Sequence, residues 1–280
     1  MMQDPLVLGI DLGTSGVRIA VIDSGCALLQ SESAPYQIGL INPFDWRERC
    51  CTLIGRLKPD YRHRLKAIAV DGTSGTLLAC DQQGLPLAEA LPYSFACPNF
   101  NAQLQALSPQ GGPASSASGS LARALHLFDQ HKAPLLLRHQ ADWISGWLLE
   151  NWSYGEEGNN LRLGWDLSKR AWPDSFISQP WWEALPEIRS SGSVLGPISP
   201  QRAKDLDLPK DLLVVAGTTD SNAAVLTADA DDDEGITVLG STLVLKRFTD
   251  QPLSPGPGTS THRVGGCLLY TSPSPRDSDS

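Results

Sequence analysis

Short apolar runs rich in β-branched residues, each followed by a turn of glycine and hydroxyl residues, are the main pattern of this chain. Pro5–Ile10 and Val17–Asp23 flank Gly-Thr-Ser-Gly at 13–16, which predicts a β-hairpin with a tight turn. Leu65–Val70 and Leu212–Ala216 have the same apolar character and are further strand candidates. The pattern therefore predicts a sheet whose strands end at polar, glycine-containing turns.

Helical patterns lie between these strands. Asn42 followed by Pro43 is typical of a helix start and predicts a helix through about Leu57. The segment after Asn222 is also predicted to be helical. Two further stretches have apolar residues at helical spacing, best explained by core packing: Leu121, Leu125 and Phe128 in one, and Trp143 and Trp147 in the other.

Four of the turns combine glycine with hydroxyl residues, at 13–16, 72–75, 217–221 and 240–242. Glycine permits close approach of the backbone, and the N–H and O–H groups can donate to phosphate or sugar oxygens. Any one of them is explained equally well as an ordinary structural turn. Four of them, two with an acidic residue in or beside the turn, favour a polyol or phosphate site. The first two are so alike that we expect both to be strand–turn–strand units of one sheet.

Composition narrows the functional classes to which the protein could belong. The 280 residues are 41% hydrophobic and carry a net charge of −9, which argues against a nucleic-acid-binding protein. The apolar runs are far shorter than the roughly 20 residues of a membrane span. No basic and then apolar segment begins the chain, so a cytoplasmic location is expected. Six cysteines without Cys-x-x-Cys spacing and five histidines without a His-x-x-x-His pair predict no metal cluster.

Together these residues resemble the FGGY carbohydrate kinase family, within the actin, hexokinase and Hsp70 superfamily. The resemblance is carried by Gly9–Gly16, Ala216–Ser221 and Leu239–Thr242, and their order and spacing fit over about residues 5–266. It implies an α/β fold with an actin-like ATPase (ribonuclease H-like) domain containing a mixed sheet, plus the beginning of a second such domain. Val70–Thr76 looks like the D-ribulose kinase branch, because xylulokinases usually carry a Gln-Met-His-like stretch there.

The resemblance implies ATP-dependent phosphorylation of a pentulose, D-ribulose before others, at a terminal hydroxyl with Mg²⁺. Asp220 would contact the sugar and take its hydroxyl proton, and its place at the start of a predicted helix favours the ionised form. Asp11 would position the sugar and, through water, Mg²⁺. Ser74, Ser221 and Asp71 would contact sugar hydroxyls. The ATP phosphates would be held by Gly13, Thr14 and Ser15 and by Gly240, Ser241 and Thr242.

The same resemblance divides the chain into three parts. Residues 1–228 would form the sugar-binding domain, and 229–266 would begin the ATP-binding domain. The polar, turn-rich residues 267–280 depart from the family and are predicted to be disordered. Family members are substantially longer, so the chain looks like a kinase truncated after about Gly266 by an artefactual end. Such a fragment is expected to have little kinase activity, because closure over ATP needs both domains.

Other functions stay open at this point. A xylulokinase or another FGGY polyol kinase differs from a D-ribulose kinase only in hydroxyl contacts that no motif fixes. A non-catalytic sugar-binding remnant of the first domain is a second possibility. An actin-like or Hsp70-like ATPase without a sugar substrate fits less well, because residues 71–76 and 219–221 look like the sugar kinase pattern. The oligomeric state is undetermined.

Overall fold

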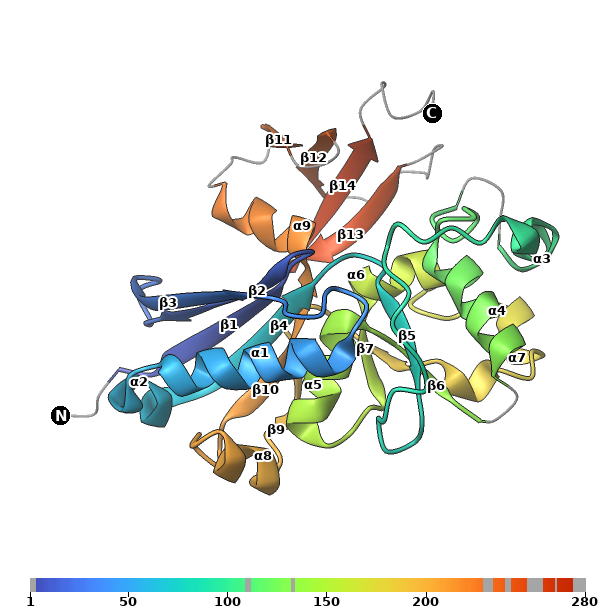
Figure 1. Cartoon of the computed structure of the whole chain (residues 1–280). Coiled ribbons are helices and arrows are strands. Elements are labelled where there is room, and N and C mark those ends of the chain that lie inside the picture. The colour runs from blue at the N-terminus through green and yellow to red at the C-terminus, as the bar shows by residue number, and fades with distance from the viewer. Residues whose placement is uncertain are drawn as a thin grey trace.

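The computed structural model describes residues 4–108, 112–131, 134–228, 234–239, 243–250, 259–264 and 266–273. Within these residues, the two largest sheets have six and four strands, and helices pack around the larger one (Figure 1). The expected α/β fold with a mixed sheet is confirmed.

The six-stranded sheet has the order β3-β2-β1-β4-β10-β9. Strand β1 pairs in parallel with β4, and β4 pairs in parallel with β10, whereas the remaining neighbours are antiparallel. Its strands are β1 (Leu6–Leu12), β2 (Gly16–Ile22), β3 (Leu28–Pro35), β4 (Leu65–Gly72), β9 (Val194–Pro197) and β10 (Leu213–Thr219). The predicted hairpin around residues 13–16 is confirmed as β1 and β2.

Two helices cover this sheet and build its main core. Helix α1 (Pro43–Arg56) contacts β2 and β3, and α5 (Gln140–Leu149) contacts β4 and β10. Asn42 caps α1, as predicted, because its side chain accepts from the N–H groups of residues 44 and 45. Trp46 of α1 and Trp143 of α5 meet edge to face with ring centroids 6.1 Å apart, so they join the two helices within the core.

The segment between β4 and β9 forms smaller units beside the sheet. Strand β5 (Leu77–Cys80) pairs with β6 (Leu136–His139), and β7 (Tyr154–Glu156) pairs with β8 (Glu187–Arg189). The other helices described are α2 (Pro59–Arg64), α3 (Asn101–Leu107), α4 (Ser120–Gln130), α6 (Glu157–Asn160), α7 (Asp174–Ile177), α8 (Pro200–Asp205) and α9 (Asp220–Ala223), with 3₁₀ turns at Pro98–Phe100, Leu161–Leu163, Trp182–Ala184 and Ala224–Thr227.

The expectation that the turns at 13–16 and 72–75 lie within one sheet as similar units is wrong. After β4 the chain leaves the large sheet, and β5 pairs with β6 instead. The reason is local packing: Gly72 lies against Gln140 and Ala141 of α5, and Thr73 donates to the Gln140 side chain. A hairpin return along β4 is also blocked, because β1 and β10 occupy both of its edges.

The four-stranded sheet is antiparallel with the order β11-β12-β14-β13. It consists of β11 (Gly235–Leu239), β12 (Leu243–Thr249), β13 (Ser260–Val264) and β14 (Cys267–Pro273). The predicted strand pair on either side of residues 240–242 is confirmed as β11 and β12. Val264 and Leu269 pack against Val225, which follows α9, so this sheet shares an apolar cluster with the segment after α9.

The prediction of disorder for residues 267–280 is wrong for residues 267–273. These residues form β14, which pairs with both β12 and β13. Leu269 is fully buried, so this stretch contributes to the core although the sequence that follows it is polar. Residues 274–280 lie outside the described part of the chain. No helix in the described residues has the length and apolar character needed to cross a membrane.

Gly217 sets the spacing of the strands that lead to the acidic residues Asp71 and Asp220. The β4–β10 register shifts between Ala216 and Thr219, and a Cβ at Gly217 would lie 2.0 Å from the Val70 carbonyl oxygen. Gly217→Ala should therefore lower the free energy of unfolding by about 2 kcal/mol or more. Urea denaturation would measure it.

Gly55→Ala is the matched control for this substitution. Gly55 lies in α1, and a Cβ there would meet nothing within 4 Å. Helix propensity should make this variant more stable by up to about 1 kcal/mol. A Gly217→Ala protein as stable as the wild type would contradict the close approach of β4 and β10.

Candidate active site

Three carboxylates converge at one edge of the large sheet. Asp11 lies near the end of β1, Asp71 lies opposite it near the end of β4, and Asp220 directly follows β10. Because these three strands are parallel to one another, their carboxyl ends share an edge (Figure 1). The structure thus brings together three of the residues that sequence motifs singled out.

Burial and neighbouring carboxylates set the electrostatics of this cluster. Burial above all, and then the negative charges of Asp11 and Asp220, raise the pKa of Asp71 to about 8. Asp71 is therefore largely protonated at neutral pH. This reduces the net negative charge at the sheet edge to that of the other two carboxylates.

The helix start was expected to favour the ionised form of Asp220, but it is not the main influence on the pKa of this residue. Burial raises the pKa of Asp220, the charge of Asp11 raises it further, and the Ser221 N–H and Lys246 oppose the shift. Helix α9 has only one turn, so its dipole is small compared with desolvation of the carboxylate. The backbone N–H of Ser221 donates to Asp220 Oδ1 at 2.6 Å.

Asp11 has one paired and one unpaired oxygen. Its Oδ2 accepts from Arg18 Nη1 at 2.9 Å, in an ion pair whose arginine side chain is 66% exposed. Its Oδ1 is buried and has no hydrogen-bond partner within the described residues. A buried carboxylate oxygen without a donor is poised to accept from a sugar hydroxyl or from a water on a cation.

The turn between β1 and β2 presents its hydroxyl residues to solvent. The Gly13 N–H donates to the Gly16 carbonyl at 3.0 Å, and Thr14 and Ser15 are exposed. Tyr36 fixes this turn, because its O–H donates to the Gly13 carbonyl and its N–H donates to the Ser15 carbonyl. The arrangement leaves the outward face of the turn open to a ligand.

A buried polar network fixes the neighbouring turn that carries Ser74. Thr73 Oγ1 donates to Gln140 Oε1 at 2.7 Å, and Gln140 Nε2 donates to the Tyr36 hydroxyl at 3.2 Å. Since Tyr36 also holds Gly13, the turns at 13–16 and 72–75 are tied to one framework. Ser74 itself is half-buried. Sequence reasoning missed Gln140 and Tyr36, because neither stands in a glycine–hydroxyl motif.

Lys246 is a further residue that the sequence analysis missed. It lies on β12 of the four-stranded sheet and is 2% exposed. Its Nζ donates to the carbonyl and hydroxyl oxygens of Ser221 at 2.7 and 2.9 Å and to Asn222 Oδ1 at 2.7 Å. Burial lowers its pKa to about 8, although Asp220 favours the charged form. In sequence it is one lysine within an apolar strand and carries no motif.

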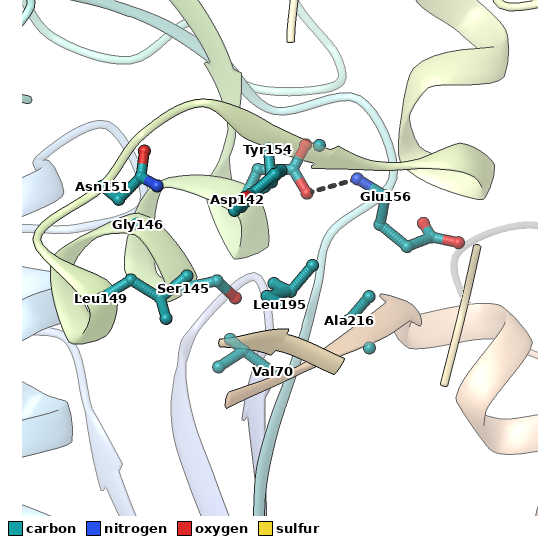
Figure 2. Close-up of a pocket in the computed structure, with 12 residues that line it drawn as sticks. Val70, Asp142, Ser145, Gly146, Leu149, Asn151, Tyr154, Glu156, Leu195 and Ala216 are labelled. Atoms are coloured by element: carbon teal, nitrogen blue, oxygen red, sulfur yellow. Dashed lines mark hydrogen bonds between the residues drawn. The ribbon is translucent and has the colours of Figure 1, made fainter. Parts of the chain in front are cut away.

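A small cavity of about 10 Å³ borders the strands that lead to Asp71 and Asp220 (Figure 2). Val70 and Ala216 line it on the sheet side, and Asp142 and Glu156 line it from α5 and β7. Asp142 Oδ1 accepts from the Glu156 N–H at 2.9 Å. Such a volume suits one water rather than a sugar, so the cavity is not a substrate site.

The remaining candidate residues cannot be placed. Gly240, Ser241 and Thr242 lie outside the described residues, although the strands on both sides of them are described. Within the described part of the chain, no group of three or more His, Cys, Asp or Glu side chains could hold a metal ion. A Mg²⁺ ion here would depend on water and phosphate oxygens for most of its ligands.

No protein-family model matches the sequence. Solved structures match over nearly the whole chain. They include a xylulose kinase from Rhodospirillum rubrum (TM-score 0.83, 17% identity, covering 96% of this chain and 60% of that one). A gluconate kinase from Lactobacillus acidophilus matches with a TM-score of 0.81 and 16% identity (97% and 60% covered). A Plasmodium falciparum glycerol kinase with ADP matches with a TM-score of 0.80 and 15% identity (96% and 61%).

These likenesses establish the fold. The chain has the α/β fold seen in the matching part of these three kinases. It spans about 60% of the length of the structures that it matches. Identities of 15–17% do not fix the substrate.

The raised pKa of Asp71 predicts a pH dependence of stability. A carboxyl whose folded-state pKa lies above its unfolded value stabilises the fold at low pH, and this contribution is lost as pH rises from about 4 through about 8. Asp71→Asn removes the titration, so its unfolding free energy should fall less than that of the wild type between pH 5 and pH 8.

Urea denaturation at both pH values would test this. Burial also raises the pKa of Glu156 to about 8, but Glu156 is present in both proteins and so cancels in the difference. Asp60→Asn, an exposed surface change, is the control and should follow the wild type. Parallel pH curves for Asp71→Asn and the wild type would contradict the shift.

Proposed function

We propose that this chain is the sugar-binding part of an ATP-dependent pentulose kinase that acts on D-ribulose. The observation that carries the proposal is the convergence of Asp11, Asp71 and Asp220 at one sheet edge, beside the open turn at 13–16. Its support is chemical: phosphoryl transfer needs a positioned alcohol, a base for its proton and donors around the phosphate. The cytoplasm is the proposed place of action.

In this proposal Asp220 accepts the proton of the terminal sugar hydroxyl while the hydroxyl oxygen bonds to the γ-phosphorus of ATP. The bond from that phosphorus to the β–γ bridging oxygen breaks, which releases ADP. Asp220 must be ionised for this role. Burial raises its pKa, and the Ser221 N–H and the Lys246 cation oppose that rise. Asp71, protonated at neutral pH, can donate a hydrogen bond to a sugar oxygen. Asp11 accepts one through its unpaired Oδ1. Donors and acceptors thus alternate around the bound polyol.

The phosphate side of the site is assigned to the two glycine–hydroxyl turns. Gly13, Thr14 and Ser15 form the exposed turn of the first domain, and residues 240–242 would approach from the second sheet. ATP supplies the transferred phosphoryl group, and Mg²⁺ neutralises charge on its phosphates when bound. Asp11 Oδ1 fits a water-mediated contact to that ion, because it is buried and lacks a donor.

Ser74 and Ser221 are the proposed sugar hydroxyl contacts. Ser74→Ala should weaken binding of D-ribulose by about tenfold, because a hydrogen bond to a half-buried hydroxyl is lost. Isothermal titration calorimetry of this chain with D-ribulose, D-xylulose and glycerol measures it. Ser31→Ala on β3, a strand with no residue in the carboxylate cluster, is the control. Tighter binding of D-xylulose than of D-ribulose would contradict the assigned sugar.

Asp220→Asn separates binding from transfer. The amide keeps the size of the side chain but cannot take up the proton, so D-ribulose affinity should change by less than about threefold. In a full-length version with a complete ATP-binding domain, sugar-dependent ADP release in the presence of MgATP should fall by about 100-fold or more. A coupled ADP assay measures the release. Unchanged release in the variant would remove Asp220 from the role of base.

A sugar-binding protein without kinase activity is the second candidate. It needs the same convergence of Asp11, Asp71 and Asp220, because hydrogen bonds from these carboxyl groups can hold a polyol without any phosphoryl transfer. Binding of D-ribulose by this chain without sugar-dependent ADP release would favour that candidate. Sugar-dependent release would favour the kinase. ATP hydrolysis that is independent of any sugar would contradict both.

A further inference from the structure

Lys246 joins the four-stranded sheet to helix α9, which carries Asp220. Its three hydrogen bonds all go to Ser221 and Asn222, the two residues after Asp220, with distances of 2.7–2.9 Å. The lysine is 2% exposed, and Asn222 is 1% exposed. A buried ammonium group is costly unless its N–H donors are satisfied, so this contact is strongly specified.

The direction of each hydrogen bond in this cluster follows from the lysine. Lysine can only donate, so Asn222 presents its oxygen to Lys246 and its Nδ2 to His262 Nδ1, at 3.1 Å. His262 Nδ1 must then accept, which places the ring proton on Nε2, 2.9 Å from Ser260 Oγ. Burial and the nearby charges of Lys246 and Arg162 lower the pKa of His262 to about 3, so the ring is neutral. Lys246 thus orients a series of hydrogen bonds that runs through Asn222 and His262 and ends at Ser260.

The same reasoning fixes the role of the Ser221 hydroxyl. Its oxygen accepts from Lys246 Nζ at 2.9 Å, so its own proton must point away from the lysine. A serine hydroxyl that is held in this way keeps its proton free to donate to a ligand beside Asp220. Without the lysine, the hydroxyl could rotate and act equally well as donor or acceptor.

We propose that Lys246 is a positioning residue for the sugar site: it holds Ser221 as a donor to a sugar oxygen and fixes helix α9, which carries Asp220. The inference rests on the proposed function, because it assigns a sugar contact to Ser221. It differs from a purely structural role in one respect. A structural lysine would affect stability alone, whereas a positioning lysine affects sugar affinity through Ser221.

A double-mutant cycle separates these roles. D-ribulose affinity is measured by calorimetry for the wild type, Lys246→Met, Ser221→Ala and the double variant, with thermal melting as the check of folding. Each single variant should weaken binding by about tenfold. The double variant should be no more than about twofold weaker than Ser221→Ala, because both changes remove the same contact. Additive losses, or unchanged affinity in Lys246→Met, would overturn the proposal.

Two further measures keep the test decisive. Lys66→Met is the matched control, because Lys66 is an exposed lysine on β4 paired with Asp211, and its affinity should equal that of the wild type. If Lys246→Met does not fold, Lys246→Gln takes its place in the cycle with the same expected pattern.

Amide hydrogen exchange tests the contact when no sugar binds. If the wild type binds none of the sugars tested, the proposed function fails, yet residues 220–223 should still exchange at least tenfold faster in Lys246→Met. The β10 amides of the large sheet should exchange at the wild-type rate in that variant. Equal exchange of residues 220–223 in both proteins would overturn the positioning role independently of sugar binding.

Discussion

The parallel pairing of β4 with both β1 and β10 is the constraint on which the candidate site depends. It brings the ends of three strands to one edge and so forces three acidic residues into a small, partly desolvated space. Burial disfavours the charged form of Asp71, the negative charges of Asp11 and Asp220 add to this effect, and the pKa of Asp71 rises to about 8 as a result. Gly217 is part of the same constraint, because only a residue without a side chain fits against the Val70 carbonyl.

Positive charge reaches this edge from two directions. Arg18 lies on β2, next to β1, and pairs with Asp11 at the surface. Water screens this ion pair, so its contribution to stability is small. Lys246 approaches from the second sheet and is buried, so its charge acts on Asp220 with little screening. The four-stranded sheet therefore contributes a positive charge, Lys246 of β12, to the surroundings of the carboxylate cluster. Strand β12 is far in sequence from β1 and β4, which carry Asp11 and Asp71.

Local signals in the sequence predicted a good part of the fold. Asn42 and Pro43 specify a helix start through capping that involves only neighbouring residues, and the Gly-Thr-Ser-Gly turn joins the two strands of a hairpin. The same turn signal failed at 72–75, because the packing of Gly72 against α5 sends the chain into another sheet. Disorder was wrongly expected for residues 267–273, because their polar, turn-rich sequence does not indicate the pairing with β13 and with the more distant β12 that orders them.

The sequence by itself determined the strands and helices with strong local patterns, the α/β class, and the motif residues Asp11, Asp71 and Asp220. Each of these follows from residue types at short spacing. Only the tertiary structure decided which carboxyl is protonated, which oxygens lack a donor, and that Lys246 and Gln140 belong to the site. Burial and contact between distant segments set these properties, and neither is encoded in the spacing of neighbouring residues.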